Sequence, residues 1–362
     1  MVAIAQIVES FAYGTAKSVV QLCELLSDND QVTVFYGHRQ GTEIDLQSSS
    51  QRVQWRPLPG RGKTKHIANM RFLREQLRGS FDVLHGHSAY GGLYAKVLGP
   101  QLGIKTLYSP RGFSFLREDF PAIGRKVFRA VEKATARRCI TVCCGPYEQT
   151  LAQSLGGQCV RINNGYDVTA PVSIDRVSNN VLGVGRICHQ KGFDIFTDVA
   201  RRLPENSFTW VGDIQSGKAS ALENVPPNVD VISYLPHHEL LEKVKFARLI
   251  LLPSRWEGLS RFLIESVCLG KAIVTSRFPG NLDCLDGDSS GESFANGMAC
   301  RTTDDYVRAV RQLSRDDETL DRMQWASHRY AAENFDLQSI REQWKALYQS
   351  FGNKLFDREI GV

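Results

Sequence analysis

Short, continuously apolar runs alternate with segments of helical spacing along the whole chain of 362 residues. Apolar runs of this kind are typical of strands that are buried on both faces of a parallel sheet. The predicted strands cover 2–8, 31–36, 81–84, 105–108, 139–143, 159–162, 181–184, 207–211, 229–233, 249–252 and 271–275. The predicted helices between them include 15–26, 67–77, 93–98, 123–138, 194–203, 238–246 and 261–269. The alternation predicts an α/β fold with two Rossmann-like, doubly wound parallel sheets.

The strand-helix pattern is interrupted once, by a polar segment that contains Pro171 and the pair Asn179 and Asn180. A chain of this length favours two domains. We therefore expect a first domain over 1–165, a hinge over 166–180, a second domain over 181–325 and C-terminal helices over 326–362 that return toward the first domain. Because ligands of doubly wound sheets bind outside the carboxyl ends of the strands, two facing sheets predict a cleft between the domains.

The composition is that of an ordinary globular protein, with 42% hydrophobic and 23% charged residues. No apolar run reaches the roughly 20 residues of a membrane span, and the first residues lack the basic region of a signal peptide. The nine cysteines are scattered without metal-ligand spacing. We therefore expect buried thiols and a cytoplasmic location.

Charge is distributed unevenly between the two halves. Residues 1–165 hold 21 Lys and Arg against 12 Asp and Glu, whereas residues 166–362 hold 23 against 27. The basic half predicts an anionic partner, which can be a phosphate-bearing acceptor, a membrane surface or a nucleic acid. Much of the excess lies in 56–78 and in the helix 123–138. This helix also carries an apolar stripe, so it either lies in a membrane interface or packs normally on its own sheet.

A loop with two cations follows the predicted strand 181–184. Arg186 and Lys191 each adjoin a glycine, Gly185 and Gly192. Glycines allow the backbone to approach a ligand, and the two cations suit phosphate oxygens. Such cations would stabilise the charge that grows on a departing diphosphate. The alternative is a solvated loop.

Two carboxylates follow the predicted strand 249–252. Glu257 lies in the loop, and Glu265 lies on a helix that Ser260 can cap and that closes at Gly270. The start of that helix exposes N–H groups that suit a diphosphate, while carboxylates accept hydrogen bonds from sugar hydroxyls. The alternatives are a loop charge and an exposed helical glutamate.

These two motifs together resemble the Arg/Lys diphosphate loop and the E-x7-E motif of GT-B retaining glycosyltransferases of family 4. The resemblance extends over nearly the whole chain, through the segments 14–17, 82–88, 163–165 and 210–213. It implies the GT-B fold, a nucleotide-sugar donor with UDP or GDP, and no metal ion or other cofactor.

The resemblance also implies roles for individual residues. Arg186 and Lys191 would bind the diphosphate, and Glu257 the donor sugar. Glu265 would hold the ribose hydroxyls. The remaining donor contacts would come from Gly258, Leu259, Ser260, Gly14, Tyr234, Leu235 and Gly212, and the acceptor contacts from His87, Thr15 and Arg111.

The chain departs from the family at Ser109-Pro-Arg111-Gly, where close family members carry Thr-Pro-His-Gly. Arginine cannot act as a base, so Arg111 binds an acidic acceptor or the donor phosphates, is a surface arginine beside a turn, or marks weakened or abolished activity. His85 and His87 end a predicted strand. We expect them to point to opposite faces, with His87 in the acceptor site and His85 packed in the strand.

The sequence therefore predicts a metal-independent retaining glycosyltransferase. The expected acceptor is a saccharide or a polyprenyl-diphosphate-linked saccharide of bacterial surface polysaccharide biosynthesis, such as capsule, lipopolysaccharide or exopolysaccharide. The basic first domain would contact the cytoplasmic face of the inner membrane. The alternatives are a nucleotide-sugar epimerase or hydrolase and a non-catalytic nucleotide-sugar-binding protein, while a nucleic-acid partner is not expected.

Overall fold

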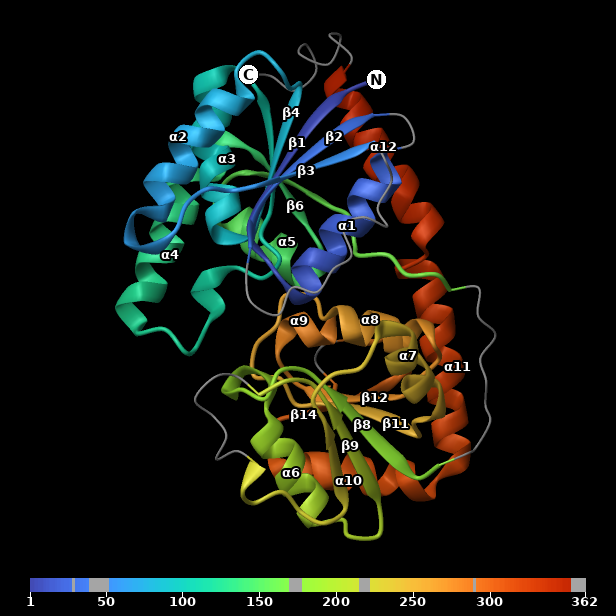
Figure 1. The fold of residues 1–362 in the computed structure, drawn as a ribbon. Helices are drawn as coiled ribbons and strands as arrows, with labels where there is room; N and C mark the ends of the chain where they lie inside the picture. The colour runs from blue at the N-terminus through green and yellow to red at the C-terminus, as the bar shows by residue number, and fades with distance from the viewer. Residues whose placement is uncertain (28–29, 39–51, 169–177, 215–221, 289–290, 353–362) are drawn as a thin grey trace. The chain divides into compact units, whose positions relative to one another are not determined.

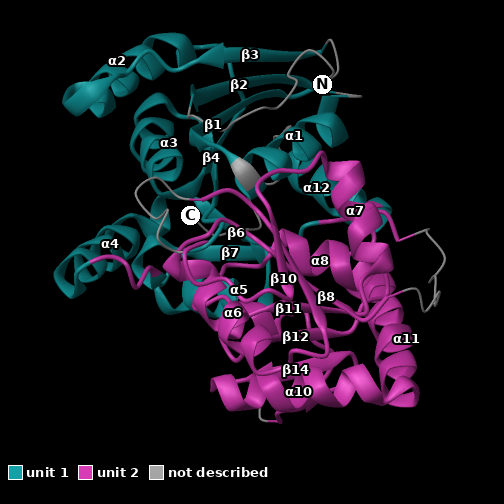
Figure 2. Cartoon of the chain, turned by 60° about the horizontal axis from the view of Figure 1, so that its bottom comes forward, with its two compact units in different colours: residues 1–116, 121–164, 338–362 teal, residues 117–120, 165–337 magenta. Residues whose placement is uncertain are grey.

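The computed structural model describes residues 1–27, 30–38, 52–168, 178–214, 222–288 and 291–352 (Figure 1). The chain forms two compact units (Figure 2). Unit 1 comprises residues 1–116, 121–164 and 338–362, and unit 2 comprises residues 117–120 and 165–337. Residues 169–177 of the predicted hinge lie outside the described part of the chain. The predicted boundary at residue 325 falls inside a helix of unit 2, α11 (Asp317–Asn334), whereas α12 (Leu337–Gly352) belongs almost entirely to unit 1.

Unit 1 is built on a seven-stranded parallel sheet in the order β3-β2-β1-β4-β5-β6-β7. Its strands are β1 (Ala3–Phe11), β2 (Gln31–His38), β3 (Val53–Pro57), β4 (Val83–His87), β5 (Lys105–Ser109), β6 (Ile140–Cys143) and β7 (Gln158–Arg161). Its helices before α12 are α1 (Tyr13–Ser27), α2 (Lys65–Leu77), α3 (Ser88–Leu102), α4 (Ala122–Thr135) and α5 (Pro146–Ser154). Figure 1 shows α2, α3 and α4 on one side of the sheet and α1 and α12 on the other.

Unit 2 is built on a second seven-stranded sheet in the order β10-β9-β8-β11-β12-β14-β13. Its strands are β8 (Asn180–Val184), β9 (Ser207–Val211), β10 (Val229–Ile232), β11 (Leu249–Leu252), β12 (Ile273–Ser276), β13 (Ser293–Phe294) and β14 (Gly297–Cys300). Its helices before α11 are α6 (Phe193–Arg201), α7 (His237–Phe246), α8 (Arg261–Cys268), α9 (Pro279–Leu282) and α10 (Thr303–Arg315). The prediction of two parallel α/β sheets is confirmed, with an antiparallel β13–β14 pair at one edge.

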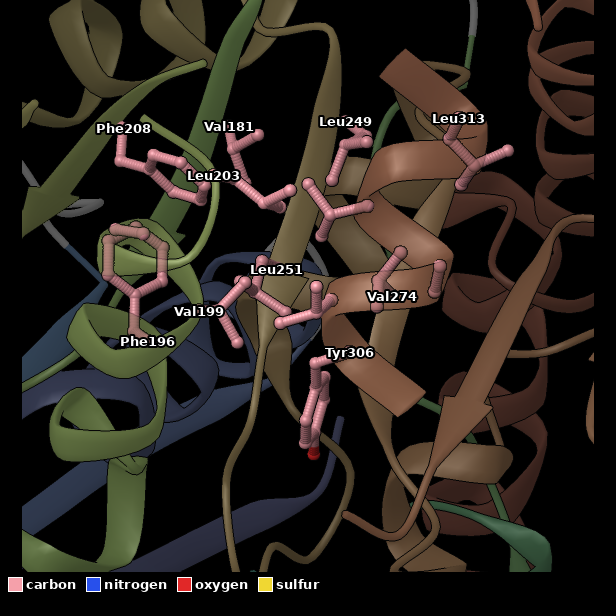
Figure 3. Packing of buried hydrophobic residues seen from close by; sticks show 14 of the residues in the cluster. Val181, Phe196, Val199, Leu203, Phe208, Leu249, Leu251, Val274, Tyr306 and Leu313 are labelled. Carbon is pink, nitrogen blue, oxygen red and sulfur yellow. The ribbon is translucent and has the colours of Figure 1, made fainter. Parts of the chain in front are cut away.

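The core of unit 2 shows why the central strands read as continuous apolar runs. The sheet is covered on one face by α6, α10 and α11, whose apolar sides pack onto Val181, Leu249 and Leu251 (Figure 3). The next residues along, such as Leu182 and Ile250, are also fully buried, on the opposite face. Both faces are therefore removed from water, and neither needs polar positions. This two-sided burial holds the strand ends, and the loops that leave them, in fixed places.

The helix α4 is oriented in unit 1 by a buried ion pair. Lys96 of α3 places its Nζ 2.5 Å from Oε2 of Glu132 on α4, and Tyr108 donates its hydroxyl to Oε1 of the same carboxylate at 2.8 Å. The Lys96 ammonium also lies 3.6 Å from the centre of the Tyr108 ring. All three side chains are buried. The fully buried residues of α4, Glu132 and Thr135, are therefore polar.

No helix in the described part of the chain has both the length and the apolarity that crossing a bilayer requires.

The ion pair predicts an asymmetric response to substitution. Glu132→Ala should lower the free energy of unfolding by about 3–5 kcal/mol, because it leaves the Lys96 ammonium buried without its partner. The double variant Lys96→Met, Glu132→Leu removes both charges and should recover part of that loss. Urea unfolding of the three proteins measures this. A Glu132→Ala protein as stable as the parent would contradict the anchoring role.

Candidate functional site

The strand order of unit 2 reverses between β8 and β11. From β8 the chain proceeds outward through β9 and β10 to one edge, and then returns to place β11 on the other side of β8. The chain therefore leaves these two adjacent strands toward opposite faces of the sheet, and ligands of doubly wound sheets bind at such a switch point, outside the carboxyl ends of the strands. Both predicted motifs leave the sheet at this edge, over residues 185–192 and 253–260.

Hydrogen bonds join the two loops directly. The backbone N–H of Arg255 donates to the carbonyl oxygen of Gln190 at 2.7 Å, and Gln190 Nε2 donates to the carbonyl oxygen of Trp256 at 3.0 Å. The Arg255 guanidinium donates to the carbonyl oxygen of His189 at 2.7 Å. The structure thus brings together two segments that are more than sixty residues apart in sequence.

Two glycines make this close approach possible. Gly192 has φ of +73°, and a Cβ atom there would lie 2.2 Å from the carbonyl oxygen of Pro253. Gly212, at the end of β9, has φ of +150°, and a Cβ atom would lie 2.1 Å from the carbonyl oxygen of Gly185. A side chain at position 192 would push the two loops apart, and one at position 212 would push the end of β9 away from Gly185. Gly212, which was predicted as a donor contact, is thus needed because the backbone of Gly185 packs directly against it.

Lys191 and Glu257 meet at the carboxyl edge of the sheet. The Lys191 Nζ atom lies 2.5 Å from Glu257 Oε1, and the two side chains are 19% and 10% exposed. Arg186 leaves the same loop and is half-buried. The pKa of Asp119 is lowered by its hydrogen bond with Arg117 and further by the charge of Arg186. In the free protein Glu257 thus balances the charge of Lys191, and Arg186 lies close enough to Asp119 to lower its pKa.

Glu265 lies on α8 and forms a second polar centre. Its Oε1 atom is 3.2 Å from His237 Nε2 and 3.4 Å from Arg261 Nε, and its side chain is 6% exposed. His237 begins α7, and Pro236 separates it from Tyr234 and Leu235, which were predicted as donor contacts. Tyr234 is 59% exposed. His237 was not predicted, although a histidine two residues after Leu235 was the available signal.

The start of α8 differs in one detail from the prediction. Ser260 occupies the N-cap position, but its side chain makes no capping hydrogen bond, so the predicted side-chain cap is wrong. Leu259 and Ser260 are buried, and Gly258 is half-buried. The loop is supported instead by α9, where a Cβ atom on Gly280 would lie 2.0 Å from the carbonyl oxygen of Gly258. This support could not be predicted from the sequence, because α9 is a single turn.

A cavity of about 1050 Å³ lies beside this site, at the carboxyl ends of β12 and β14. It shares Pro253 and Arg255 with the loop after β11. Its lining includes Asp194, Arg277 and Tyr306 but not Lys191, Glu257 or Glu265. The bidentate pair of Arg255 with Asp194, at 2.9 and 2.6 Å, occupies the boundary between the two regions.

In unit 1 the strand order reverses between β1 and β4. Gly14 and Thr15 lie in the first turn of α1, which follows β1. Gly14 is exposed with open space around it, and Thr15 is half-buried. Glu9, near the end of β1, is buried and paired with Lys65 of α2 at 2.7 Å. This ion pair was not predicted, because Lys65 appeared as one of many cations in a basic stretch.

His85 and His87 belong to one buried hydrogen-bonded network. Their ring centres are 4.1 Å apart, so the expectation that they point to opposite faces is wrong, since residues two apart on a strand share a face. His87 Nε2 lies 2.7 Å from Gln6 Oε1, and Gln6 Nε2 donates to the Tyr348 hydroxyl at 2.9 Å. His85 Nδ1 lies 2.6 Å from that hydroxyl, and its Nε2 lies 2.9 Å from Ser109 Oγ. Both histidines are fully buried.

This network fixes the tautomer of His87. The amide oxygen of Gln6 can only accept, so His87 Nε2 must carry the proton and Nδ1 must hold a free electron pair. His87 Nδ1 has no hydrogen-bond partner in the structure. Burial lowers the pKa of both histidines well below the usual value, helped by the charge of Arg111. His87 is therefore neutral, and its Nδ1 atom can accept a hydrogen bond but cannot donate one.

Among the described residues, no group of three His, Cys, Asp or Glu side chains could hold a metal ion.

Arg111 is held in a strained conformation next to this network. Arg111 and Ser88 have φ of +56° and +58°, and they are the described non-glycine residues with positive φ. Strain of this kind gathers at binding sites. Arg111 donates to Asn164 Oδ1 at 2.6 Å, and the buried Glu148 accepts from the backbone N–H of Gly112 at 2.7 Å. The structure thus gathers His87 and Arg111 near the carboxyl ends of neighbouring strands.

Two sequence families match the chain, one on each unit. Residues 13–163 match "Glycosyl transferase 4-like domain", and residues 171–329 match "Glycosyl transferases group 1". Among curated relatives, the "Uncharacterized 41.2 kDa protein in cps region" of Klebsiella pneumoniae is 26% identical over 54% of this chain and 60% of that protein. An alpha-D-kanosaminyltransferase of Streptomyces kanamyceticus is 23% identical over 48% of this chain and 46% of that enzyme. The matches thus span less than two thirds of these relatives.

Solved structures resemble the fold over nearly the whole chain. A sucrose-phosphate synthase from Thermosynechococcus elongatus has a TM-score of 0.81 at 16% identity, covering 97% of this chain and 99% of that one. HepE of Anabaena, solved in complex with UDP and glucose, has a TM-score of 0.78 at 15% identity, covering 97% and 100%. At these identities the likeness concerns the fold.

The buried histidines predict a pH-dependent stability. The unfolded chain binds protons near pH 6.5, whereas the folded chain resists protonation of His85 and His87. The free energy of unfolding should therefore be highest above pH 6.5 and fall below it, by about 1.4 kcal/mol per pH unit for each histidine. Urea unfolding at several pH values measures the slope. His87→Asn should reduce it, and His238→Asn, at an exposed histidine, should not. An unchanged slope in His87→Asn would contradict this origin.

Proposed function

Because this chain belongs to the GT-B glycosyltransferases, we propose that it transfers a sugar from a nucleoside-diphosphate sugar to an acceptor hydroxyl. We further propose that the anomeric configuration is retained and that no metal ion is needed. The observation that carries this proposal is the meeting of Lys191 and Glu257 at the switch point of unit 2. The UDP bound by the HepE protein of Anabaena supports UDP as the nucleotide.

The donor would lie along the carboxyl edge of the sheet in unit 2. Lys191 and Arg186 would bind the diphosphate, which would take over the role that Glu257 plays toward Lys191 in the free protein. Glu257 would then accept hydrogen bonds from the donor sugar. Glu265, with His237 beside it at 3.2 Å, would hold the ribose hydroxyls.

Backbone groups would complete the donor site. The free N–H groups at the start of α8, from Gly258 to Ser260, suit the diphosphate, and Tyr234 and Leu235 suit the base. Gly14, at the start of α1, remains a proposed donor contact from unit 1.

In the proposed reaction the bond between the anomeric carbon and the β-phosphate oxygen breaks. The acceptor oxygen forms its bond to the same carbon from the same face, and its proton passes to the departing phosphate oxygen. Negative charge grows on the diphosphate, so Lys191 and Arg186 stabilise the transition state more than the ground state. No side-chain base is needed in this step, which accommodates an arginine at position 111.

Unit 1 would supply the acceptor site. Arg111, half-buried and held by Asn164, offers a cation for an anionic group of the acceptor. Thr15 and His87 complete the proposed site, with His87 as a buried, neutral acceptor of hydrogen bonds. A cation here favours a phosphate-bearing acceptor such as a polyprenyl-diphosphate-linked saccharide at the inner membrane. The cps-region relative supports a pathway of surface polysaccharide biosynthesis.

The roles of Lys191 and Glu257 are tested by turnover of the donor. Lys191→Ala and Glu257→Gln should each lower kcat by about 10²–10³, because each removes a group that contacts the reacting part of the donor. The measurement is release of nucleoside diphosphate from UDP- and GDP-sugars, with candidate acceptors and, for slow hydrolysis, with water alone. Lys245→Ala and Glu242→Gln provide matched controls, since this exposed pair lies on α7 of the same unit.

Binding is measured separately, so that a missing acceptor does not hide the result. UDP or GDP should raise the Tm of the parent protein, and Lys191→Ala should reduce that shift. Full transfer by Lys191→Ala would overturn the assigned role. A donor that binds but never turns over across a broad acceptor panel would favour a non-catalytic binding protein, and epimerised sugar nucleotide formed without acceptor would favour an epimerase.

A further inference from the structure

The helix α4 presents its aliphatic side chains outward. Ile123, Val127 and Val131 follow one another at intervals of four residues, so they form one stripe along the helix. Their exposed fractions are 70%, 56% and 40%. Single exposed aliphatic residues are common on protein surfaces. Three in one line form an apolar patch, and such patches are typical of surfaces that bind a protein or a membrane.

The inner face of α4 shows that this orientation is built into the fold. The buried residues of the helix are Glu132 and Thr135, and Glu132 is fixed by Lys96 and Tyr108. Phe128 is half-buried against the apolar cluster that contains Phe113 and Phe115. A rotation that buried the aliphatic stripe would break the Lys96–Glu132 ion pair. The explanation of α4 as an ordinary amphipathic helix with its apolar side on the sheet is therefore wrong.

The charges beside the stripe are all positive. Lys126, Arg129 and Lys133 are exposed on α4, and Arg137 and Arg138 follow in the next turn. Glu132, the single acid of the helix, is buried and paired. The outer face of α4 therefore combines an aliphatic stripe with an uncompensated band of cations. An anionic bilayer surface has the matching chemistry, since acyl chains take up the stripe and lipid headgroups pair with the cations.

We propose that α4 is an interfacial helix through which unit 1 docks on an anionic lipid bilayer. Ile123, Val127 and Val131 enter the boundary between headgroups and acyl chains, and Lys126, Arg129 and Lys133 contact the headgroups. The buried Lys96–Glu132 pair holds the stripe outward. The docking of α4 adds to the proposed function the surface that contacts the membrane. It rests on that function only for the idea that the acceptor is lipid-linked.

Vesicle sedimentation tests the proposal without donor or acceptor. The parent protein should sediment with phosphatidylcholine vesicles that contain roughly 30% phosphatidylglycerol, and much less with pure phosphatidylcholine. Ile123→Ser, Val127→Ser removes two aliphatic side chains without changing charge and should weaken binding by about tenfold or more. Lys126→Gln, Lys133→Gln should weaken it by roughly fivefold per cation, less so at high salt.

Matched controls separate this surface from others and from the active site. Trp325→Ser removes an aromatic side chain that is 57% exposed on α11 of unit 2 and should leave vesicle binding unchanged. The α4 variants should keep the parent's Tm shift with UDP or GDP, whereas Lys191→Ala should lose that shift and keep vesicle binding. Failure of vesicle binding and failure of nucleotide binding are thus read independently.

Equal sedimentation of the parent and the Ile123→Ser, Val127→Ser variant would overturn the proposal, as would a parent protein that stays in solution with both vesicle types. Light scattering after gel filtration measures whether the protein is a monomer or a dimer. A dimer that the same variant dissociates would assign the stripe to a second copy of this chain and would also overturn the membrane assignment.

Discussion

The reversal of strand order within each sheet determines where charged side chains can gather in this protein. In unit 2 the central strands β8, β9, β11 and β12 carry no charged side chain, so the charged residues lie beyond the strand ends. Where the chain leaves two adjacent strands toward opposite faces, the loops at the strand ends form the place at which ligands of doubly wound sheets bind. In unit 2 this point lies between β8 and β11. The loop 185–192, which carries the two cations, and the loop 253–260, which carries Glu257, both begin there.

The close contact of these loops requires particular residues. Glycine at positions 192 and 212 allows backbone segments to touch, and Gly280 on α9 supports the carbonyl of Gly258 from behind. The Lys191–Glu257 pair then balances charge in the free protein. Unit 1 uses different chemistry at its own switch point, where a neutral histidine network lies near a strained arginine. The proposed diphosphate site in unit 2 and the proposed acceptor site in unit 1 thus differ in their chemistry.

Much of the fold was predictable because its strands are apolar without interruption. β8, β9 and β11 were predicted within one residue of their bounds. β3 was missed because an edge strand needs no apolar alternation, and Val53–Pro57 contains an arginine and ends in proline. The cations and carboxylates of the candidate site in unit 2 were predictable from their places after strands. The supporting contacts of His237, Gly280 and Glu148 were not, because they come from elements distant in sequence that carry no motif.

The orientation of α4 could not be predicted from the sequence either, again because it depends on residues of other elements. Its periodicity was visible in the sequence, but the direction of the apolar face depends on Lys96 and Tyr108, which come from α3 and β5. The pattern alone favours burial of the aliphatic side chains. In the structure the buried Glu132 carboxylate turns these side chains outward instead.

The central claim is that a nucleoside diphosphate binds at the switch point of unit 2. Hydrogen–deuterium exchange of the protein with and without UDP, and with and without GDP, tests it most directly. We expect one of these nucleotides to slow exchange in both 185–192 and 257–265. Slowed exchange confined to 276–278 and 301–303, which line the neighbouring cavity, or no change in either motif at saturating nucleotide, would contradict it.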